Sequence, residues 1–357
     1  MEQKKVAIVL INYKNYAKKF LHECIKSLRV QTFPSEAFKI FMVDNESTPE
    51  SVKYLKKIAP EAELILNKEN EGFAKANNQA FDRAIKQNFE YLVALNIDTI
   101  VHERWLEELV KVAEEHPEAG AVQSLIMLYP KIDKVNSLGN ELHFLGLAFC
   151  QGYGQKLPKF LTTLKEITCF SGAAVLTPAK VLKEVGMFDE TFFMYHEDTD
   201  LSWRMRMTGY KIFLASRSIV YHKYEFSRSM QQFYYLERNR IMMILENYKL
   251  LTLFLIIPVF LFMEIGVLFY SSINHVLIEK LKAYMYFFNI QHLKNIMESR
   301  REKQLRRKLK DKDVIRTFTS SLEFYQIEGG FFKFLVKYMI NSVFRFYWLI
   351  IKNIIWW

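Results

Sequence analysis

The chain has 357 residues, half of them hydrophobic, which is enough for one large domain with an appendage or for two domains. Its formal net charge of +10 favours phosphorylated ligands, an anionic membrane surface or nucleic acid as partners. The cysteines, Cys24, Cys150 and Cys169, have no paired spacing, which argues against a disulfide framework or a zinc site and fits a reducing compartment. The short apolar run at the N-terminus is typical of a first strand rather than of a signal peptide.

The first third of the chain alternates short apolar runs with amphipathic stretches of helical period. The apolar runs cover 6–11, 38–43, 63–66 and 91–95, and the helical stretches cover 17–31, 50–58, 74–87 and 104–116. This pattern predicts an α/β fold with a doubly wound, mostly parallel sheet flanked by helices. Such sheets bind ligands at the carboxyl ends of their strands, where this chain has Asn12, Asp44, Asn67 and Asp98.

The middle of the chain, 119–214, is less regular and contains an acidic segment. We expect hairpins, a strand near Thr168, a helix over 178–185 and a last strand over 219–221 that ends at His222. The acidic segment, 192–209, places Glu197, Asp198 and Asp200 within four residues. Like charges this close raise one another's pKa, which suits a general base or a cation site. The alternative is an ordinary helix start, because acidic residues favour the first helical turn.

The composition changes near residue 250, so we expect a first domain over 1–248 and a helical, hydrophobic and basic region over 249–357. The stretch 250–270 is long enough to cross a bilayer, but Pro258, Glu264 and Gly266 interrupt it. It therefore crosses the membrane, dips into it and returns, or forms a buried hairpin of a soluble domain.

Two further segments favour contact with a membrane surface. The run 300–312 is strongly basic, and 331–357 is apolar and aromatic apart from a polar stripe on one helical face. The stripe consists of Lys333, Lys337, Asn341, Arg345 and Lys352. A basic stripe beside an aromatic face is typical of a helix that lies in the membrane interface and contacts anionic lipids. Nucleic acid is the alternative partner, but it does not account for the apolar tail, so we expect no nucleic acid.

Several short motifs, taken in order, resemble those of the inverting family-2 glycosyltransferases with the GT-A fold, in the rhamnosyltransferase-like branch. The resemblance covers about 6–248. The motifs are INYKN (11–15), VDNES (43–47), NEGFAKANN (70–78), LNIDT (95–99), Gly172-Ala173, the acidic segment and His222. Each motif alone is weak, since Asp-Asn after a strand is also ordinary turn chemistry.

The resemblance implies roles for single residues in binding a nucleotide-sugar donor. Asp44 matches the aspartate that accepts a hydrogen bond from the N3–H of uracil or thymine, with an Asx turn as the alternative. Gly72 allows close approach of a ligand to the backbone at a helix N-terminus, which favours anions. Asn77 and Asn78 are equally placed by sequence. The nucleotide-sugar candidates are Asn12, Asp44, Asn45, Gly72, Asn78, Asn96, Gly172 and Arg204.

The resemblance also implies a metal site and a general base. Asn96 replaces the first aspartate of the family's Asp-x-Asp signature, which leaves Asp98 and His222 as ligands for Mn²⁺ or Mg²⁺. Asp198 is the expected base, and Glu197 holds acceptor hydroxyls or supports Asp198. An i,i+4 pair between Asp200 and Arg204 would orient this turn. Three arginines, Arg228, Arg238 and Arg240, could close on the diphosphate.

The implied function is inverting transfer of a single sugar from a UDP- or dTDP-sugar, with rhamnose as one candidate, to a lipid-linked glycan acceptor in cell-surface polysaccharide assembly. We expect the enzyme at the cytoplasmic face of the cell membrane, peripheral, monotopic or with one membrane-embedded hairpin. A processive polysaccharide synthase is one alternative, but the Gln-x-x-Arg-Trp motif of such enzymes is missing. A non-catalytic membrane scaffold is the other, and the presence of Asp44, Asp98, Asp198 and His222 argues against it.

Overall fold

The computed structural model describes residues 6–158, 161, 164–224, 232–323, 334 and 336–357. The chain divides into two compact units. Unit 1 comprises Met1–Asn140, Cys150–Met205 and Tyr210–Tyr224, and unit 2 comprises Glu141–Phe149, Arg206–Gly209 and Glu225–Trp357. This division falls earlier than residue 248, because the helix that begins at Phe233 packs on helices of unit 2. Independent folding of 1–248 stays a prediction.

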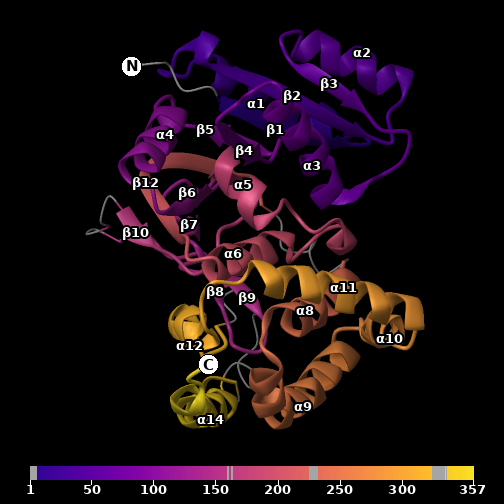
Figure 1. Ribbon diagram of the computed structural model, residues 1–357. Coiled ribbons are helices and arrows are strands. Elements are labelled where there is room, and N and C mark those ends of the chain that lie inside the picture. Colours follow the sequence, from indigo (N-terminus) through magenta and orange to yellow (C-terminus); the bar gives the residue numbers. More distant parts are fainter. Residues whose placement is uncertain (1–5, 159–160, 162–163, 225–231, 324–333, 335) are drawn as a thin grey trace. The chain divides into compact units, whose positions relative to one another are not determined.

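Unit 1 is built on a large mixed sheet (Figure 1). Its strands are β1 (Val6–Tyr13), β2 (Phe38–Asn45), β3 (Glu63–Leu66), β4 (Tyr91–Leu95), β5 (Thr99–Val101), β6 (Ala119–Leu128), β7 (Val135–Ser137), β10 (Leu164–Glu166), β11 (Ala174–Pro178) and β12 (Lys211–His222). The strand order is β10-β12-β6-β11-β4-β1-β2-β3, with β5 paired to β12 and β7 paired to β6. A separate ribbon, most of which belongs to unit 2, pairs β8 (Asn140–Leu142) with β9 (Ala148–Cys150).

The first four strands run parallel, which confirms the prediction for the first third of the chain. The second half of the sheet is antiparallel in part, because β11 inserts between β4 and β6 in the opposite direction. The strand expected near Thr168 corresponds to β10, which ends at Glu166, whereas β11 was not predicted. β11 is buried on both faces, so its apolar run has no alternation from which a strand could be predicted.

Helices cover both faces of the sheet, and each face has its own hydrophobic core. The helices of unit 1 are α1 (Tyr16–Arg29), α2 (Pro49–Ile58), α3 (Gly72–Lys86), α4 (Trp105–Glu115), α5 (Ala179–Val185) and α6 (Glu197–Met207), the last of which continues into unit 2. Short 3₁₀ turns lie at Ser35–Ala37 and Glu190–Phe192. Apolar residues such as Leu21, Ile25 and Leu28 follow the helical period and bury one face of α1 against the sheet. The helices predicted in the first third of the chain and over 178–185 are confirmed to within a few residues.

Unit 2 is mainly helical. Its elements are α8 (Phe233–Asn247), α9 (Leu250–Ile273), α10 (Leu277–Tyr286), α11 (Ile290–Arg306), α12 (Asp311–Val314), a 3₁₀ turn (Ile315–Thr317), a π-helical turn (Val336–Ile340) and α14 (Asn341–Ile354). α8 packs against α10 and α11. The interrupted stretch 250–270 forms one continuous helix, α9, despite Pro258, so a hairpin within this stretch is wrong.

Two residues of the predicted basic run, Arg300 and Arg307, cap α8 rather than face a partner. Arg300 donates to the carbonyls of Leu245 and Tyr248, and Arg307 donates to that of Asn247. The last carbonyls of a helix have no partner within it, so these cations stabilise the C-terminus of α8. The expectation that the whole run 300–312 faces lipid is therefore wrong for these residues.

The predicted polar stripe on the last helix is also incomplete. Asn341 is buried, and its side chain exchanges hydrogen bonds of 2.8 and 3.1 Å with the backbone of Leu322. Arg345 and Lys352 are exposed, whereas Lys333 and the side chain of Lys337 lie outside the described residues. Asn341 thus belongs to the packed interior of unit 2.

Candidate active site

β1 and β2 lie side by side in the sheet (Figure 1), and their register pairs Asn12 with Asp44 near the strand ends. The Asn12 amide donates to Asp44 Oδ1 at 2.6 Å, and its Oδ1 accepts from the backbone N–H of Ala17 at 2.7 Å. The hydroxyls of Ser47 and Ser51 donate to Asp44 Oδ2 at 2.7 and 2.6 Å. Asp44 therefore organises the loop between β2 and α2, which is the Asx-turn alternative. Its contact with a nucleotide base stays a prediction.

Asn45 and Gly72 fasten the start of α3 to the end of β2. The Asn45 amide donates to the Gly72 carbonyl at 3.1 Å. Gly72 has φ +76°, and a Cβ here would lie 2.5 Å from the carbonyl oxygen of Phe193. The N–H groups of Phe73 and Ala74 donate to that same oxygen at 2.7 and 3.2 Å. The first turn of α3 thus binds the segment before α6 through these two N–H groups, and the expected contact of this helix start with an anionic ligand stays a prediction.

The structure separates Asn77 from Asn78. The Asn78 side chain donates to the Phe188 carbonyl at 2.8 Å and accepts from the Phe188 N–H at 3.1 Å. Asn77 donates to a carbonyl of its own helix, that of Phe73, at 3.0 Å. Asn78 therefore positions the chain that leads into the acidic segment, and its predicted contact with the nucleotide is untested.

Asp98 and His222 face each other at the junction of β5 and β12. The register pairs Thr99 with His222, which places Asp98 beside the imidazole. Asp98 Oδ1 lies 3.2 Å from His222 Nε2, and both side chains are buried. This pairing joins residues far apart in sequence, and at this separation the two side chains can pair directly or share a cation, so the metal site stays a prediction.

Two residues that the sequence analysis missed support this pair. The Tyr16 hydroxyl donates to Asp98 Oδ2 at 2.6 Å, and Asn136 Oδ1 lies 2.9 Å from His222 Nδ1. A hydrogen bond from Nδ1–H leaves the lone pair of Nε2 directed at Asp98 and available to a metal. Tyr16 follows the INYKN motif directly, which is a usable sequence signal. Asn136 lies on β7 and has none.

The residues present fit a divalent cation with few protein ligands. Adjacent ligands of an octahedral ion with bonds of about 2.1 Å lie roughly 3.0 Å apart, close to the separation of Asp98 Oδ1 and His222 Nε2. Within the described residues, no group of three or more His, Cys, Asp and Glu side chains could hold a metal. The remaining coordination positions would thus go to water and to phosphate oxygens of a donor.

The three carboxylates of the acidic segment, Glu197, Asp198 and Asp200, lie in the first turn of α6, so the helix-start interpretation is confirmed. Asp198 Oδ2 accepts from the N–H of Gly172 at 2.9 Å, and its Oδ1 accepts from the N–H of Thr199 at 2.7 Å. Glu197 is buried, and its Oε2 has no hydrogen-bond partner among the described residues. The two carboxylates therefore lie side by side in the chain but in different surroundings.

Burial acts on both carboxylates in the same direction. It raises the pKa of Glu197 well above its ordinary value, and the charges of Asp198 and Asp200 raise it further. Burial also raises the pKa of Asp198, while the N–H groups of Gly172 and Thr199 oppose the shift by stabilising the ionised form. The two N–H groups favour the ionised form of Asp198, whose pKa is still raised by burial. Glu197 lacks such donors at Oε2 and therefore retains its proton more readily than Asp198.

The predicted pair between Asp200 and Arg204 is confirmed, with Nε 2.7 Å from Oδ2. The same guanidinium donates to the carbonyls of Val185, Gly186 and Met187, the last at 2.7 Å. Arg204 thus holds the chain after α5 against α6. We assign it this positioning role in place of nucleotide binding.

Of the three arginines expected to close on the diphosphate, the structure describes Arg238 and Arg240. Arg228 lies outside the described residues. Arg240 is fully buried in unit 2 and ion-paired with Glu237 and Glu264, so the expectation for it is wrong. Arg238 is buried as well, with its guanidinium 5.0 Å from the ring centroid of Tyr286.

The sheet order and its helical layers define a GT-A glycosyltransferase fold. The sequence model of glycosyl transferase family 2 matches residues 7–186, which is 180 of the 357 residues. The chain therefore belongs to glycosyl transferase family 2.

Its relatives agree with this assignment. Two are described as N-acetylglucosaminyl-diphospho-decaprenol L-rhamnosyltransferase of Mycobacterium tuberculosis, from strains CDC 1551 / Oshkosh and ATCC 25618 / H37Rv. Each is 25% identical over 205 residues, which cover 52% of this chain and 66% of the relative, just under two thirds of its length. A crystal structure of GalNAc-T7 with UDP, GalNAc and Mn²⁺ superposes on this chain with a TM-score of 0.54 at 16% sequence identity. The match covers 68% of this chain and 48% of the GalNAc-T7 chain.

Proposed function

We propose that this glycosyltransferase transfers one sugar with inversion from a UDP- or dTDP-sugar to a lipid-linked glycan acceptor, at the cytoplasmic face of the membrane. One observation carries the proposal. The segment Gly172-Ala173 links the two chemical groups, because Gly172 donates to Asp198 and the Ala173 carbonyl accepts from the N–H of Asn96 at 2.9 Å. Two residues after Asn96 comes Asp98, paired with His222. The proposed base, Asp198, and the proposed metal ligands, Asp98 and His222, are thus connected through the same short segment of unit 1.

The proposed reaction is a single displacement at the anomeric carbon. Asp198 accepts the proton of the acceptor hydroxyl as its oxygen forms a bond to that carbon. The bond from the anomeric carbon to the phosphate oxygen breaks on the opposite face, and the nucleoside diphosphate takes the electron pair. Asp98 and His222 would hold Mn²⁺ or Mg²⁺, which when bound offsets the charge of the diphosphate. Tyr16 and Asn136 keep the two ligands oriented.

The relatives support the donor and the acceptor class. Their description names L-rhamnose as the sugar transferred and N-acetylglucosaminyl-diphospho-decaprenol as the acceptor. A lipid diphosphate acceptor also agrees with the basic and apolar composition of residues 249–357. We therefore propose rhamnose from dTDP-rhamnose as the first donor to test.

The experiment is a donor screen with the detergent-solubilised full chain. Nucleotide release is measured with UDP- and dTDP-sugars, a polyprenyl-diphosphate-linked N-acetylglucosamine acceptor and Mn²⁺, with and without EDTA. We expect release that depends on one donor class, on the acceptor and on the metal. The proposal would be contradicted if, for every donor, nucleotide release were the same with and without the acceptor, and if calorimetry showed no metal-dependent binding of UDP or dTDP.

A further inference from the structure

Helix α9 has two different faces. The structure contains this one helix that is long and apolar enough to cross a bilayer, within the part of the chain that it describes. One face is buried in unit 2 and includes Ile256, Met263 and Glu264. The other exposes large apolar side chains at helical spacing, among them Phe254, Leu261 and Ile265.

The buried face is polar at its centre. Glu264 Oε2 accepts from Lys280 Nζ and from the Tyr284 hydroxyl, each at 2.6 Å, and its Oε1 pairs with Arg240. Arg240 comes from α8, and Lys280 and Tyr284 come from α10. A helix that crossed the bilayer on its own would have to leave these cations, which hold the middle of α9 to the body of unit 2.

The beginning of α9 is held in the same way. Asp311 Oδ2 accepts from the Thr252 hydroxyl at 2.6 Å and from the N–H of Lys249 at 2.9 Å. The indole N–H of Trp357 donates to the Thr252 hydroxyl at 2.9 Å. Polar contacts thus attach α9 to the rest of unit 2 from its first turn to its centre.

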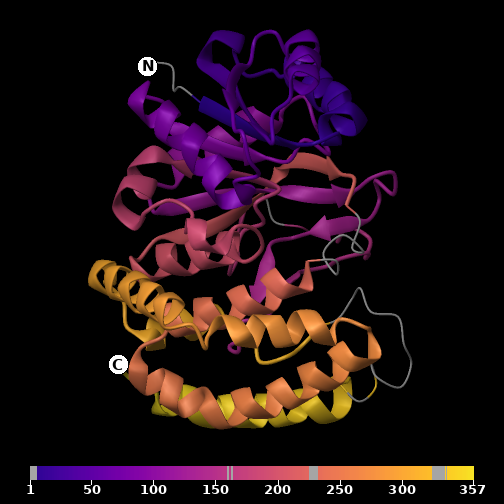
Figure 2. The same cartoon turned by 90° about the vertical axis from the view of Figure 1, so that its right-hand side faces the viewer.

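Helix α14 lies beside α9 and repeats its two-faced character (Figure 2). The Tyr347 hydroxyl donates to the Leu255 carbonyl of α9 at 2.7 Å. Phe344, Trp348 and Ile351 are buried, whereas Phe346 and Leu349 are exposed. The two helices together present an outward apolar face, which we call the α9–α14 face.

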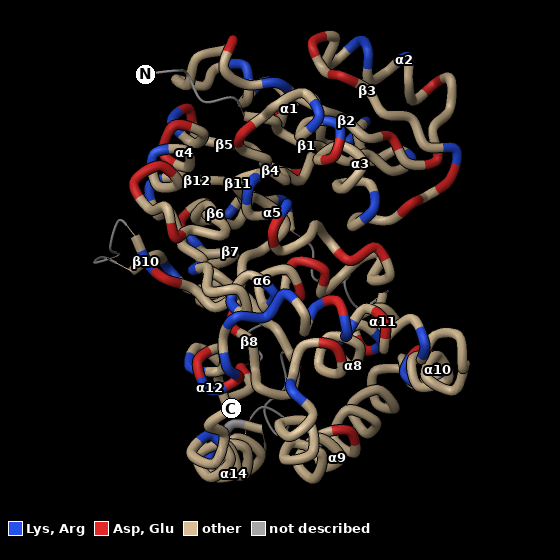
Figure 3. The backbone as a smooth tube through the Cα atoms, viewed as in Figure 1, with Lys and Arg blue, Asp and Glu red and all other residues tan. Residues whose placement is uncertain are grey.

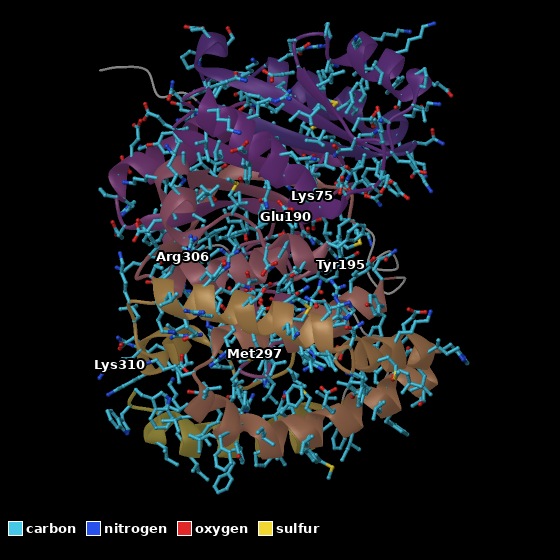
Figure 4. All side chains as sticks on the ribbon, turned by 45° about the vertical axis from the view of Figure 1, so that its right-hand side comes forward. Lys75, Glu190, Tyr195, Met297, Arg306 and Lys310 are labelled. Atoms are coloured by element: carbon cyan, nitrogen blue, oxygen red, sulfur yellow. The ribbon has the colours of Figure 1, made fainter. Side chains whose placement is uncertain are left out.

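Few residues of α9 and α14 are charged (Figure 3), and the exposed cations of α14 are Arg345 and Lys352. Trp356 at the end of the α9–α14 face is 67% exposed, and Lys310 Nζ lies 5.7 Å from the centroid of its ring. Lys310 lies at the border of unit 2 (Figure 4), and Lys312 and Arg316 nearby are also exposed. Tryptophan with lysine at the edge of an apolar surface matches the headgroup level of an anionic bilayer.

We infer that α9 and α14 lie in the plane of the membrane, with the α9–α14 face immersed in one leaflet and Lys310 at anionic headgroups, so that α9 does not cross. The occupant is a bilayer surface, because the face is apolar, it is bordered by exposed cations, and its helices are long. The inference deepens the proposed membrane location and does not depend on the transfer chemistry.

The first test determines the topology of α9 in sealed inverted membrane vesicles. Cysteine replaces His275, exposed just after α9, in one variant and Lys56, exposed on α2, in another. A membrane-impermeant maleimide is added from outside, and the parent chain supplies the blank for its native cysteines. We expect both positions to be labelled from the same side. Labelling from opposite sides would overturn the inference.

The second test measures lipid binding by flotation of the full chain with vesicles of phosphatidylcholine, with and without phosphatidylglycerol. Phe254→Ser and Phe346→Ser should each lower binding about tenfold, because each removes a large apolar side chain from the membrane. Lys310→Gln should lower only the preference for phosphatidylglycerol. Val30→Ser, at an exposed apolar residue of unit 1, is the matched control.

Circular dichroism verifies that each variant is folded. Binding that Phe254→Ser and Phe346→Ser leave unchanged would overturn the inference. So would a soluble chain that does not float and self-associates through the α9–α14 face. Loss of sugar transfer with normal flotation would count against the proposed function alone.

Discussion

The adjacent carboxylates Glu197 and Asp198 of unit 1 differ from Glu237 of unit 2 in the direction in which their buried surroundings shift the pKa. In unit 1, Glu197 and Asp198 are adjacent acids, and burial raises the pKa of each. In unit 2, Glu237 lies against Arg240 and Lys280, which lower its pKa to about 2 although burial alone would raise it. A buried carboxylate with cations is a structural tie, whereas one without them retains proton affinity that chemistry can use. The presence or absence of cations beside a buried carboxylate therefore distinguishes the candidate active site of unit 1 from the ion pairs that stabilise unit 2.

The largest effect should come from removing the base. Asp198→Asn keeps the shape but loses the proton acceptor, so we expect transfer to fall by about 10²–10⁴-fold. Nucleotide release in the donor assay described above measures the loss, and metal-dependent nucleotide binding is a second readout that should not change. Asp133→Asn, at an exposed aspartate of unit 1, is the control for the loss of one charge. Wild-type activity in Asp198→Asn would show that the base assignment is wrong.

Removing the buried cation Lys280 from unit 2 should lower the free energy of unfolding and leave sugar transfer by the folded protein unchanged. Lys280→Met leaves Glu237 and Glu264 short of a cation, and breaking a buried pair in this way costs about 3–5 kcal/mol of unfolding free energy. Denaturant unfolding in detergent measures the change. Lys282→Met removes an exposed pair with Glu279 on the same helix and should cost less than about 1 kcal/mol. Equal losses in the two variants would refute the contrast between buried and exposed pairs.

Local patterns were enough to predict much of unit 1. The parallel first half follows from apolar runs and amphipathic helices, and Asn12 and Asp44 meet because both close their strands. The Asp200–Arg204 pair also follows from helical spacing. By contrast, Asp98 meets His222 only through the pairing of β5 with β12, which no local period encodes.

Tertiary contacts explain what the sequence analysis misjudged. From the sequence, Glu264 is interpreted as an interruption of a membrane-crossing helix. Its partners, Arg240 and Lys280, lie 24 and 16 residues away in the chain, so local spacing does not reveal the ion pairs. Arg204 reads as a ligand contact, yet it binds carbonyls of the chain after α5. In both cases a charged side chain has its partner on another element, and spacing along the sequence cannot reveal that partner.

A smaller effect is expected at the support of the metal ligands. Asn136→Ala removes the group that orients His222, and loss of such a partner typically weakens metal affinity about 10–100-fold. Calorimetric titration of Mn²⁺ with saturating nucleotide measures the affinity directly. Asn140→Ala, a nearby asparagine that bonds with Ser137 instead, is the matched control. A change in activity without a change in Mn²⁺ affinity would assign Asn136 a merely structural role.

The smallest effect is the sharpest test of the comparison between the units. Because the folded-state pKa of Glu197 is raised, its contribution to stability is full below its unfolded-state pKa and is lost as the pH rises through the folded-state value. Glu197→Gln should therefore be more stable than the parent chain at neutral pH, by of order 1 kcal/mol, and the difference should vanish below about pH 4. Glu237 has the opposite sign, since its contribution is present at neutral pH and is lost as the pH falls toward about 2. Glu237→Gln should accordingly destabilise the chain at neutral pH, and unfolding curves across the acid range would distinguish the two. If both variants lost stability at neutral pH, Glu197 would also be a structural tie, and the charge balance would no longer mark unit 1 as the site of proton transfer.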